Sequence, residues 1–143
     1  GLVGSEMCIR DSEITAQVAR SAVRASTNLP VKYIVVDTLT GRTGRYLAAF
    51  RSRKTVVAVC YTLHAQRILA LSYGVKPILR DKSLDDRYHF LADAMEVIDE
   101  TEQLHDDDLL VSVGGSFSPE RGASYVEIAC VGDIRERNSH ANN

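Results

Sequence analysis

The sequence predicts an α/β fold: a three-layer sandwich in which a five-stranded, mainly parallel sheet has helices on both faces and the last strand runs antiparallel. Short apolar runs rich in valine and isoleucine alternate with segments of helical periodicity. Most of these runs are apolar at successive positions, as expected for strands that are covered on both faces. The loop between the last two runs is too short for a parallel crossover, so that pair is predicted to be antiparallel.

The first helix is predicted over Glu13–Ala25. Ile14, Val18, Ala22 and Ala25 recur at helical spacing, and Ser12 is placed to serve as an N-cap. A turn at Asn28-Leu29-Pro30 ends this helix, and the apolar run Tyr33–Val36 is the first buried strand.

The next elements repeat this alternation of helix and strand. A helix over Gly41–Arg51 has one apolar side formed by Tyr46, Leu47 and Phe50. It is followed by a strand over Lys54–Cys60, a helix over Leu63–Tyr73 closed by Gly74 as its C′ residue, and a short strand over Val75–Leu79.

The last third contains a long helix and two strands. Leu84–Leu104 has apolar residues on one face and acidic residues on the other, which predicts an amphipathic helix. The strand Leu109–Val113 is followed by a loop over Gly114–Gly122 and then by Tyr125–Val131. In that last strand Glu127 interrupts the apolar pattern, which favours an edge position.

The two ends of the chain are predicted to lie outside the folded domain, which we place at residues 13–132. Gly1–Ser12 shows no helical or strand period, and Glu6–Ser12 resembles the translated end of a transposon adapter used in sequencing libraries. We therefore interpret residues 1–12 as a non-native segment and expect the native sequence to start near Glu13, within a longer reading frame. Residues 133–143 are polar and predicted to be a frayed tail.

Composition narrows the class of protein. The 143 residues, 45% of them hydrophobic and 25% charged, fit one globular domain. A net charge of -2 favours neither nucleic acid nor an anionic membrane as a partner, and no apolar run reaches the ~20 residues of a membrane span. Three cysteines without a CxxC pair predict neither a disulfide framework nor a zinc site, and they favour a reducing, cytoplasmic location.

The loop after the first strand is the strongest candidate for chemistry. In an open parallel sheet ligands bind beyond the carboxyl ends of the strands, and here Thr38, Thr40, Gly41, Arg42 and Thr43 lie at the start of a helix. Free amides and the positive end of the helix dipole favour an anion there, the hydroxyls can add hydrogen bonds, and Arg42 can add a charge. The alternative is that Thr40 only caps the helix and Arg42 pairs with a surface acid. The loop has neither the Walker lysine nor a GxGxxG pattern.

Two other groupings are better explained structurally. Cys60 and His64 invite a nucleophile interpretation, but no oxyanion glycine or orienting acid accompanies them, which favours a buried small side chain beside a surface histidine. His105 with Asp106, Asp107 and Asp108 is favoured as a solvated acidic turn, because consecutive residues point in diverging directions.

The loop before the last strand belongs with the candidate anion site if the last two strands pair as predicted. Ser118, Arg121 and Gly122 would then reach the same end of the sheet, where Arg121 could close over an anion held at Thr38–Thr43. Taken alone, the segment is a hairpin loop.

These motifs together resemble the pyruvate kinase carboxy-terminal domain over Glu13 to about Val131. The resemblance lies in YIVVDTLTGRTGRYLAAFR, in TVVAVCYTLHAQRILALSYGVKPIL and in LLVSVGGSFSPERGASYVEIACV. It implies a five-stranded sheet with an antiparallel last strand. It also implies that Thr38, Thr40, Gly41, Arg42 and Thr43 hold the phosphate of a sugar-phosphate or nucleotide effector, and that the loop with Ser118, Arg121 and Gly122 closes on it.

The resemblance also bears on the parent enzyme, which transfers phosphate from phosphoenolpyruvate to ADP with Mg²⁺ and K⁺ in a separate barrel domain. No position of this chain matches that machinery, so the fragment is expected to have no catalytic residue, metal or cofactor of its own and to be inactive alone. The family further implies a homo-oligomer, a tetramer in the parent. The alternative is a free-standing α/β module that binds small phosphorylated metabolites.

Overall fold

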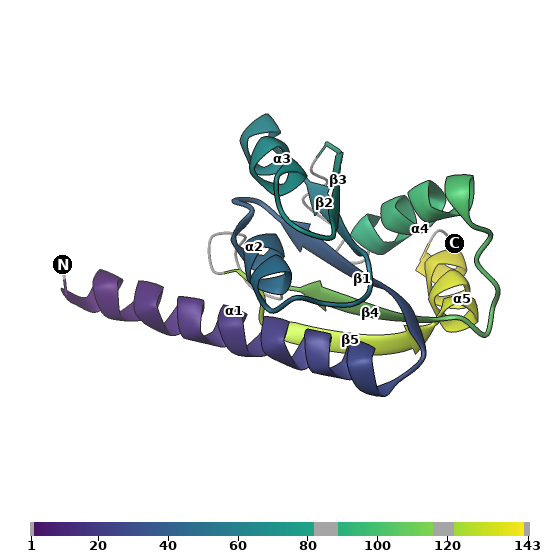
Figure 1. Cartoon of the computed structure of the whole chain (residues 1–143), viewed down its shortest axis with the longest axis horizontal. Coiled ribbons are helices and arrows are strands. Elements are labelled where there is room, and N and C mark those ends of the chain that lie inside the picture. Colours follow the sequence, from purple (N-terminus) through teal and green to yellow (C-terminus); the bar gives the residue numbers. More distant parts are fainter. Residues whose placement is uncertain (1, 82–88, 116–121, 142–143) are drawn as a thin grey trace.

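A computed structural model describes residues 2–81, 89–115 and 122–141, which form five helices and five strands (Figure 1). In chain order the elements are α1 (Leu2–Asn28), β1 (Val31–Thr38), α2 (Arg42–Ala49), β2 (Val56–Cys60), α3 (Leu63–Ala70), β3 (Val75–Leu79), α4 (His89–Thr101), β4 (Leu109–Gly114), β5 (Tyr125–Cys130) and α5 (Val131–Ala141).

The sheet has the strand order β3-β2-β1-β4-β5, with β1 at its centre. β1 pairs in parallel with both β2 and β4, and β2 pairs in parallel with β3. β5 runs antiparallel to β4 at the edge of the sheet, so the predicted direction and edge position of the last strand are both confirmed.

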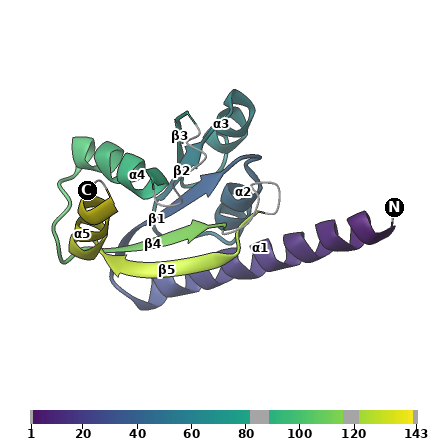
Figure 2. The same cartoon turned by 180° about the vertical axis from the view of Figure 1, so that it is seen from behind.

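Helices cover both faces of the sheet, which confirms the predicted three-layer sandwich (Figures 1 and 2). One hydrophobic core contains side chains of α1, α2 and α3, among them Ala22, Leu47 and Leu69. The core on the other face contains side chains of α4 and α5, among them Leu91 and Ile134. β1 contributes Ile34 and Val36 to the first core and Val35 to the second, because successive side chains of a strand point to opposite faces.

The first helix differs from the prediction in its start and in its buried face. It begins at Leu2, so Ser12 lies inside the helix, where its hydroxyl is 2.8 Å from the hydroxyl of Tyr46 on α2, and Ser12 is not an N-cap. Ile14 is 44% exposed, and the residues that face the sheet are small: Thr15, Ala19, Ala22 and Ser26. Their spacing of four, three and four residues keeps them on one helix face, and small side chains let α1 approach the sheet closely.

Residues 133–141 of the predicted frayed tail belong instead to helix α5, which corrects that expectation, and residues 142–143 lie outside the described residues. Val131 and Ile134 are buried against the α4 face of the sheet, and burial of one such side chain stabilises by about 1.5–3 kcal/mol. Arg135 also binds Asp106, at 2.8 Å, and Arg137 binds Glu127 of β5, at 3.0 Å. The sequence prediction failed here because two buried residues in eleven give almost no amphipathic pattern.

Other predicted boundaries shift by a few residues. α3 ends at Ala70, so Gly74 is not its C′ residue, although Gly74 does have a positive φ of 70° in the turn before β3. The described part of the fourth predicted helix runs from His89 to Thr101, and residues 84–88 of that prediction lie outside the described residues. Within the described part of the chain, no helix is long and apolar enough to span a membrane.

Candidate anion-binding site

The start of α2 lies directly beyond the carboxyl end of central strand β1. β1 ends at Thr38 and α2 begins at Arg42, so only three residues separate them. Gly41, the residue before the helix, has φ 91°, a left-handed conformation that glycine adopts without strain. A Cβ at Gly41 would make ordinary contacts of 3.7–3.8 Å with Ile68 and Ala65 of α3, so conformation rather than crowding requires glycine here.

The threonines fold this loop onto itself. The Gly41 amide donates to Thr38 Oγ1 at 2.9 Å, and the Arg42 amide donates to Thr40 Oγ1 at 3.3 Å. The N-cap residue of α2 is Gly41, which has no side chain to cap the helix, so Thr40 only accepts from the amide of the first helical residue. Each hydroxyl accepts one of these bonds and keeps its own hydrogen for another partner.

The next two amides of the helix, those of Thr43 and Gly44, do not donate to a threonine hydroxyl. The first backbone bond of α2 runs from the Arg45 amide to the Gly41 carbonyl. Among the residues that the structure describes, the amides of Thr43 and Gly44 donate no hydrogen bond. Thr43 is 3% exposed. The start of α2 therefore retains backbone donors at its positive end.

Arg42 is turned toward the loop that precedes β5. A Cβ at Gly122 would lie 2.8 Å from Arg42 Nη2, so the guanidinium rests directly against the Gly122 backbone. Arg42 Nε is buried and has no hydrogen-bond partner among the described residues. A buried N–H without an acceptor costs about 1–3 kcal/mol, and a bound anion would remove that cost.

Helix α1 completes this arrangement through Thr15. Thr15 is fully buried and its hydroxyl donates to the Ala123 carbonyl, at a long 3.5 Å. The same hydroxyl would lie only 2.5 Å from a Cβ at Gly122, whose φ is 78°. Gly122 is thus held between Thr15 and Arg42, where no larger residue fits without displacement.

Of the residues predicted to form one site, the structure places Gly122 against Arg42. The described residues Thr38, Thr40, Gly41, Arg42 and Thr43 lie at the start of α2, and Gly122 lies against Arg42. Ser118 and Arg121 lie outside the described residues. Thr15 was missed, because its only signal is membership of the small-residue face of α1, and the sequence analysis placed Ile14 there.

The other candidate groupings are used structurally. Cys60 is fully buried, and burial raises the pKa of its thiol to about 11, which keeps it protonated; His64 is exposed. Asp106 binds Arg135, and Asp108 accepts a hydrogen bond from the His105 amide at 2.8 Å. In the described ranges, no three His, Cys, Asp or Glu side chains come together as a possible metal-ligand group.

Comparison with known proteins places the chain among enzyme domains. A family model described as pyruvate kinase, alpha/beta domain, matches residues 16–129. The chain is 30% identical over 132 residues to a pyruvate kinase of Borreliella burgdorferi, covering 90% of this chain and 28% of that protein. It is 31% identical over 125 residues to one of Lactobacillus delbrueckii subsp. bulgaricus, covering 87% and 21%. The chain thus spans about a quarter of the length of the relatives it matches.

Proposed function

This chain belongs to the family of pyruvate kinase alpha/beta domains, and from that premise we propose that it binds a phosphorylated effector at the start of α2. The single observation that carries the proposal is the buried Nε of Arg42 beside two backbone amides, all three without a hydrogen-bond partner among the described residues. All three donors belong to adjacent residues at the positive end of one helix, and a phosphate group offers them several acceptor oxygens.

The effector that we propose is a sugar phosphate or a nucleotide. Gly122 contacts the Arg42 guanidinium, so this glycine borders the proposed donor group. Thr38, Thr40, Gly41 and Thr43 would surround the phosphate, with the threonine hydroxyls donating to it. Gly122, with Ser118 and Arg121, would form the other wall.

For the whole protein we propose pyruvate kinase activity, the transfer of phosphate from phosphoenolpyruvate to ADP. In that proposal the described residues regulate and do not catalyse, and the magnesium and potassium ions act elsewhere in the enzyme. We also propose a homo-oligomer. The edge position of β5 and the 44% exposure of Ile128 on that strand supply a surface for self-association. Sedimentation equilibrium of this chain would test it, and a strictly monomeric species at all concentrations would count against it.

Isothermal calorimetry with glucose 6-phosphate and with AMP tests the effector site. We expect Arg42→Ala to weaken binding of the effector by about 1–3 kcal/mol, since it removes hydrogen bonds to a charged group. Arg45→Ala is the matched control, because Arg45 is an exposed arginine one turn further along α2. Equal affinities for the two variants would exclude Arg42 from the site.

A further inference from the structure

A hollow of about 470 Å³ lies at the amino ends of β1 and β2. Apart from Glu102, which follows α4, its lining residues lie at the start of β1 or directly before β2, whereas the candidate effector site follows the carboxyl end of β1. The two sites are therefore at opposite ends of the same strand. The lining includes three cations, one carboxylate and two hydroxyl groups: Lys32, Arg53, Lys54, Glu102, Tyr33 and Thr55.

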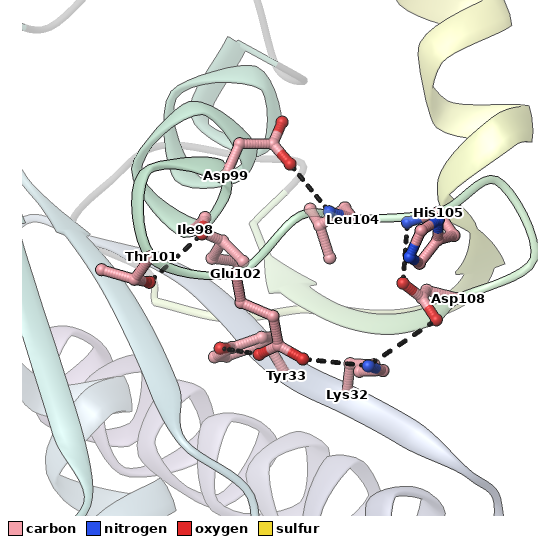
Figure 3. A network of polar contacts seen from close by, with 9 residues as sticks. All are labelled: Lys32, Tyr33, Ile98, Asp99, Thr101, Glu102, Leu104, His105 and Asp108. Atoms are coloured by element: carbon pink, nitrogen blue, oxygen red, sulfur yellow. Dashed lines mark hydrogen bonds and ion pairs between the residues drawn. The ribbon is translucent and has the colours of Figure 1, made fainter.

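An irregularity in β1 organises one wall of the hollow. Val31 pairs with Leu109 of β4 and Tyr33 pairs with the next residue, Leu110, so Lys32 is an extra residue in the strand. As a result the consecutive residues Lys32 and Tyr33 both reach Glu102, which follows the end of α4 (Figure 3).

Both oxygens of Glu102 are used by these partners. Lys32 Nζ donates to Oε1 at 2.9 Å and the Tyr33 hydroxyl donates to Oε2 at 2.7 Å. Asp108 adds a weaker contact to Lys32, 4.0 Å away. The hydrogen bond to Glu102 raises the pKa of Tyr33 to about 12, and hydrogen bonds from Tyr33 and Lys32 lower the pKa of Glu102. Glu102 is thus a fixed anion that already has its partners.

The other wall carries two cations, Arg53 and Lys54, on a turn before β2. Ser52 Oγ accepts from the Lys54 amide and donates to the Lys54 carbonyl, both at 3.0 Å, which fixes the turn that carries Arg53 and Lys54. Arg51 points elsewhere, with its guanidinium 4.7 Å from the centre of the Tyr73 ring. Within the described ranges, the side chains of Arg53 and Lys54 make no hydrogen bond or ion pair.

We propose that this hollow binds a small anion with at least two negative charges, such as an organic phosphate or a di- or tricarboxylate. Three cations against one carboxylate leave a surplus of two positive charges in the lining. Because Glu102 is occupied by Lys32 and Tyr33, it does not neutralise the opposite wall. A volume of about 470 Å³ is in the range of small-molecule sites. Tyr33 and Thr55 add neutral groups that can orient the ligand.

Nuclear magnetic resonance titration with inorganic pyrophosphate and with citrate, at constant ionic strength, tests the proposal. We expect saturable shifts of the backbone amides of Lys32, Tyr33, Lys54 and Thr55. The double variant Arg53→Gln, Lys54→Gln should weaken this binding at least about tenfold, because it removes the two unpaired charges. Binding of only one of the two probes would identify phosphate or carboxylate as the preferred chemistry.

A control variant separates a site from a general effect of charge. Arg67→Gln with Lys76→Gln removes two exposed cations from α3 and β3, away from the hollow lining, and should leave the affinity unchanged. Arg42→Ala should also leave it unchanged, so failure of this proposal and failure of the effector site are distinguishable. Absence of saturable shifts, or equal weakening by both double variants, would overturn the proposal.

Discussion

The two ends of β1 offer positive groups in different ways. Beyond its carboxyl end, Arg42 is packed against Gly122 with a buried Nε, and the neighbouring donors are backbone amides at fixed positions. At its amino end, Arg53 and Lys54 are solvent-accessible side chains on a turn, beside a carboxylate that has its own partners. If both sites bind anions as proposed, the first would select a ligand by geometry at short range, and the second would select by number of charges.

Of the changes that test this comparison, replacement of Gly122 should have the largest effect, on both the free energy of unfolding and effector binding. A Cβ there meets Thr15 Oγ1 at 2.5 Å and Arg42 Nη2 at 2.8 Å, in addition to the strain of a φ of 78°. Gly74 is a matched control, since it has φ 70° and nothing within 4 Å of its Cβ. We expect Gly74→Ala to lower the free energy of unfolding by about 1–2 kcal/mol, for strain alone. Gly122→Ala should lower it by at least about 1 kcal/mol more, because of crowding.

Urea denaturation of both variants measures that difference, and effector binding provides a second readout. Gly122→Ala should also weaken binding of the effector, because Arg42 must move. Binding of pyrophosphate at the amino-end hollow should be unchanged. Equal stabilities of the two variants would show that the close approach of Gly122 to Arg42 and Thr15 contributes nothing.

Added salt should have an intermediate effect. Between 50 and 500 mM NaCl we expect affinity at the amino-end hollow to fall about tenfold, because exposed charges are screened over a few ångströms at high salt. The site at α2 should lose less than about threefold, since its donors are partly buried. Titrations at both salt concentrations measure the two effects, and an equal loss at both sites would remove the proposed difference between them.

The smallest expected effect concerns Tyr33. Glu102→Gln should lower the pKa of Tyr33 from about 12 toward the ordinary value of 10, because the charged acceptor is lost. A tyrosine with a raised pKa stabilises the fold below pH 10 and loses that contribution as the pH rises toward 12. Carbon-13 labelling of tyrosine rings with a pH titration follows the change directly. An unchanged pKa would mean that Glu102 does not accept from Tyr33 in solution.

The fold could be predicted from the sequence because its strands have unambiguous local signals. Runs such as Val56–Cys60 are apolar at every position, and the short loop before Tyr125 left only an antiparallel pairing. Helix α5 could not be predicted, since its stability depends on Ile134 packing into a core formed by distant segments and on Arg137 meeting Glu127. Tertiary contacts of this kind leave no periodicity in the local sequence.

The candidate site was also predictable only in part. The hydroxyls, Gly41 and Arg42 follow a buried strand, and that position alone predicts an anion site at a helix start. The contact between Arg42 and Gly122 depended on the pairing of β5, which was inferred correctly. The burial of Arg42 Nε and the part played by Thr15 depend on how closely α1 packs, and side-chain type does not encode that distance. The extra residue Lys32 in β1 could not be predicted either, because it depends on the pairing of β1 with β4.

The length of helix α1 would make movement at the Thr15 contact detectable at the outer end of the helix. Its 27 residues form a rod about 40 Å long whose first turns extend past the sheet, as Figures 1 and 2 show. Thr15 lies near the middle of this rod and touches the segment over Arg42. Any repositioning of that segment would tilt a stiff body and would be magnified at its far end. A spin label or fluorophore on the outer turns could therefore read, from about 20 Å away, whether the interior contact is made.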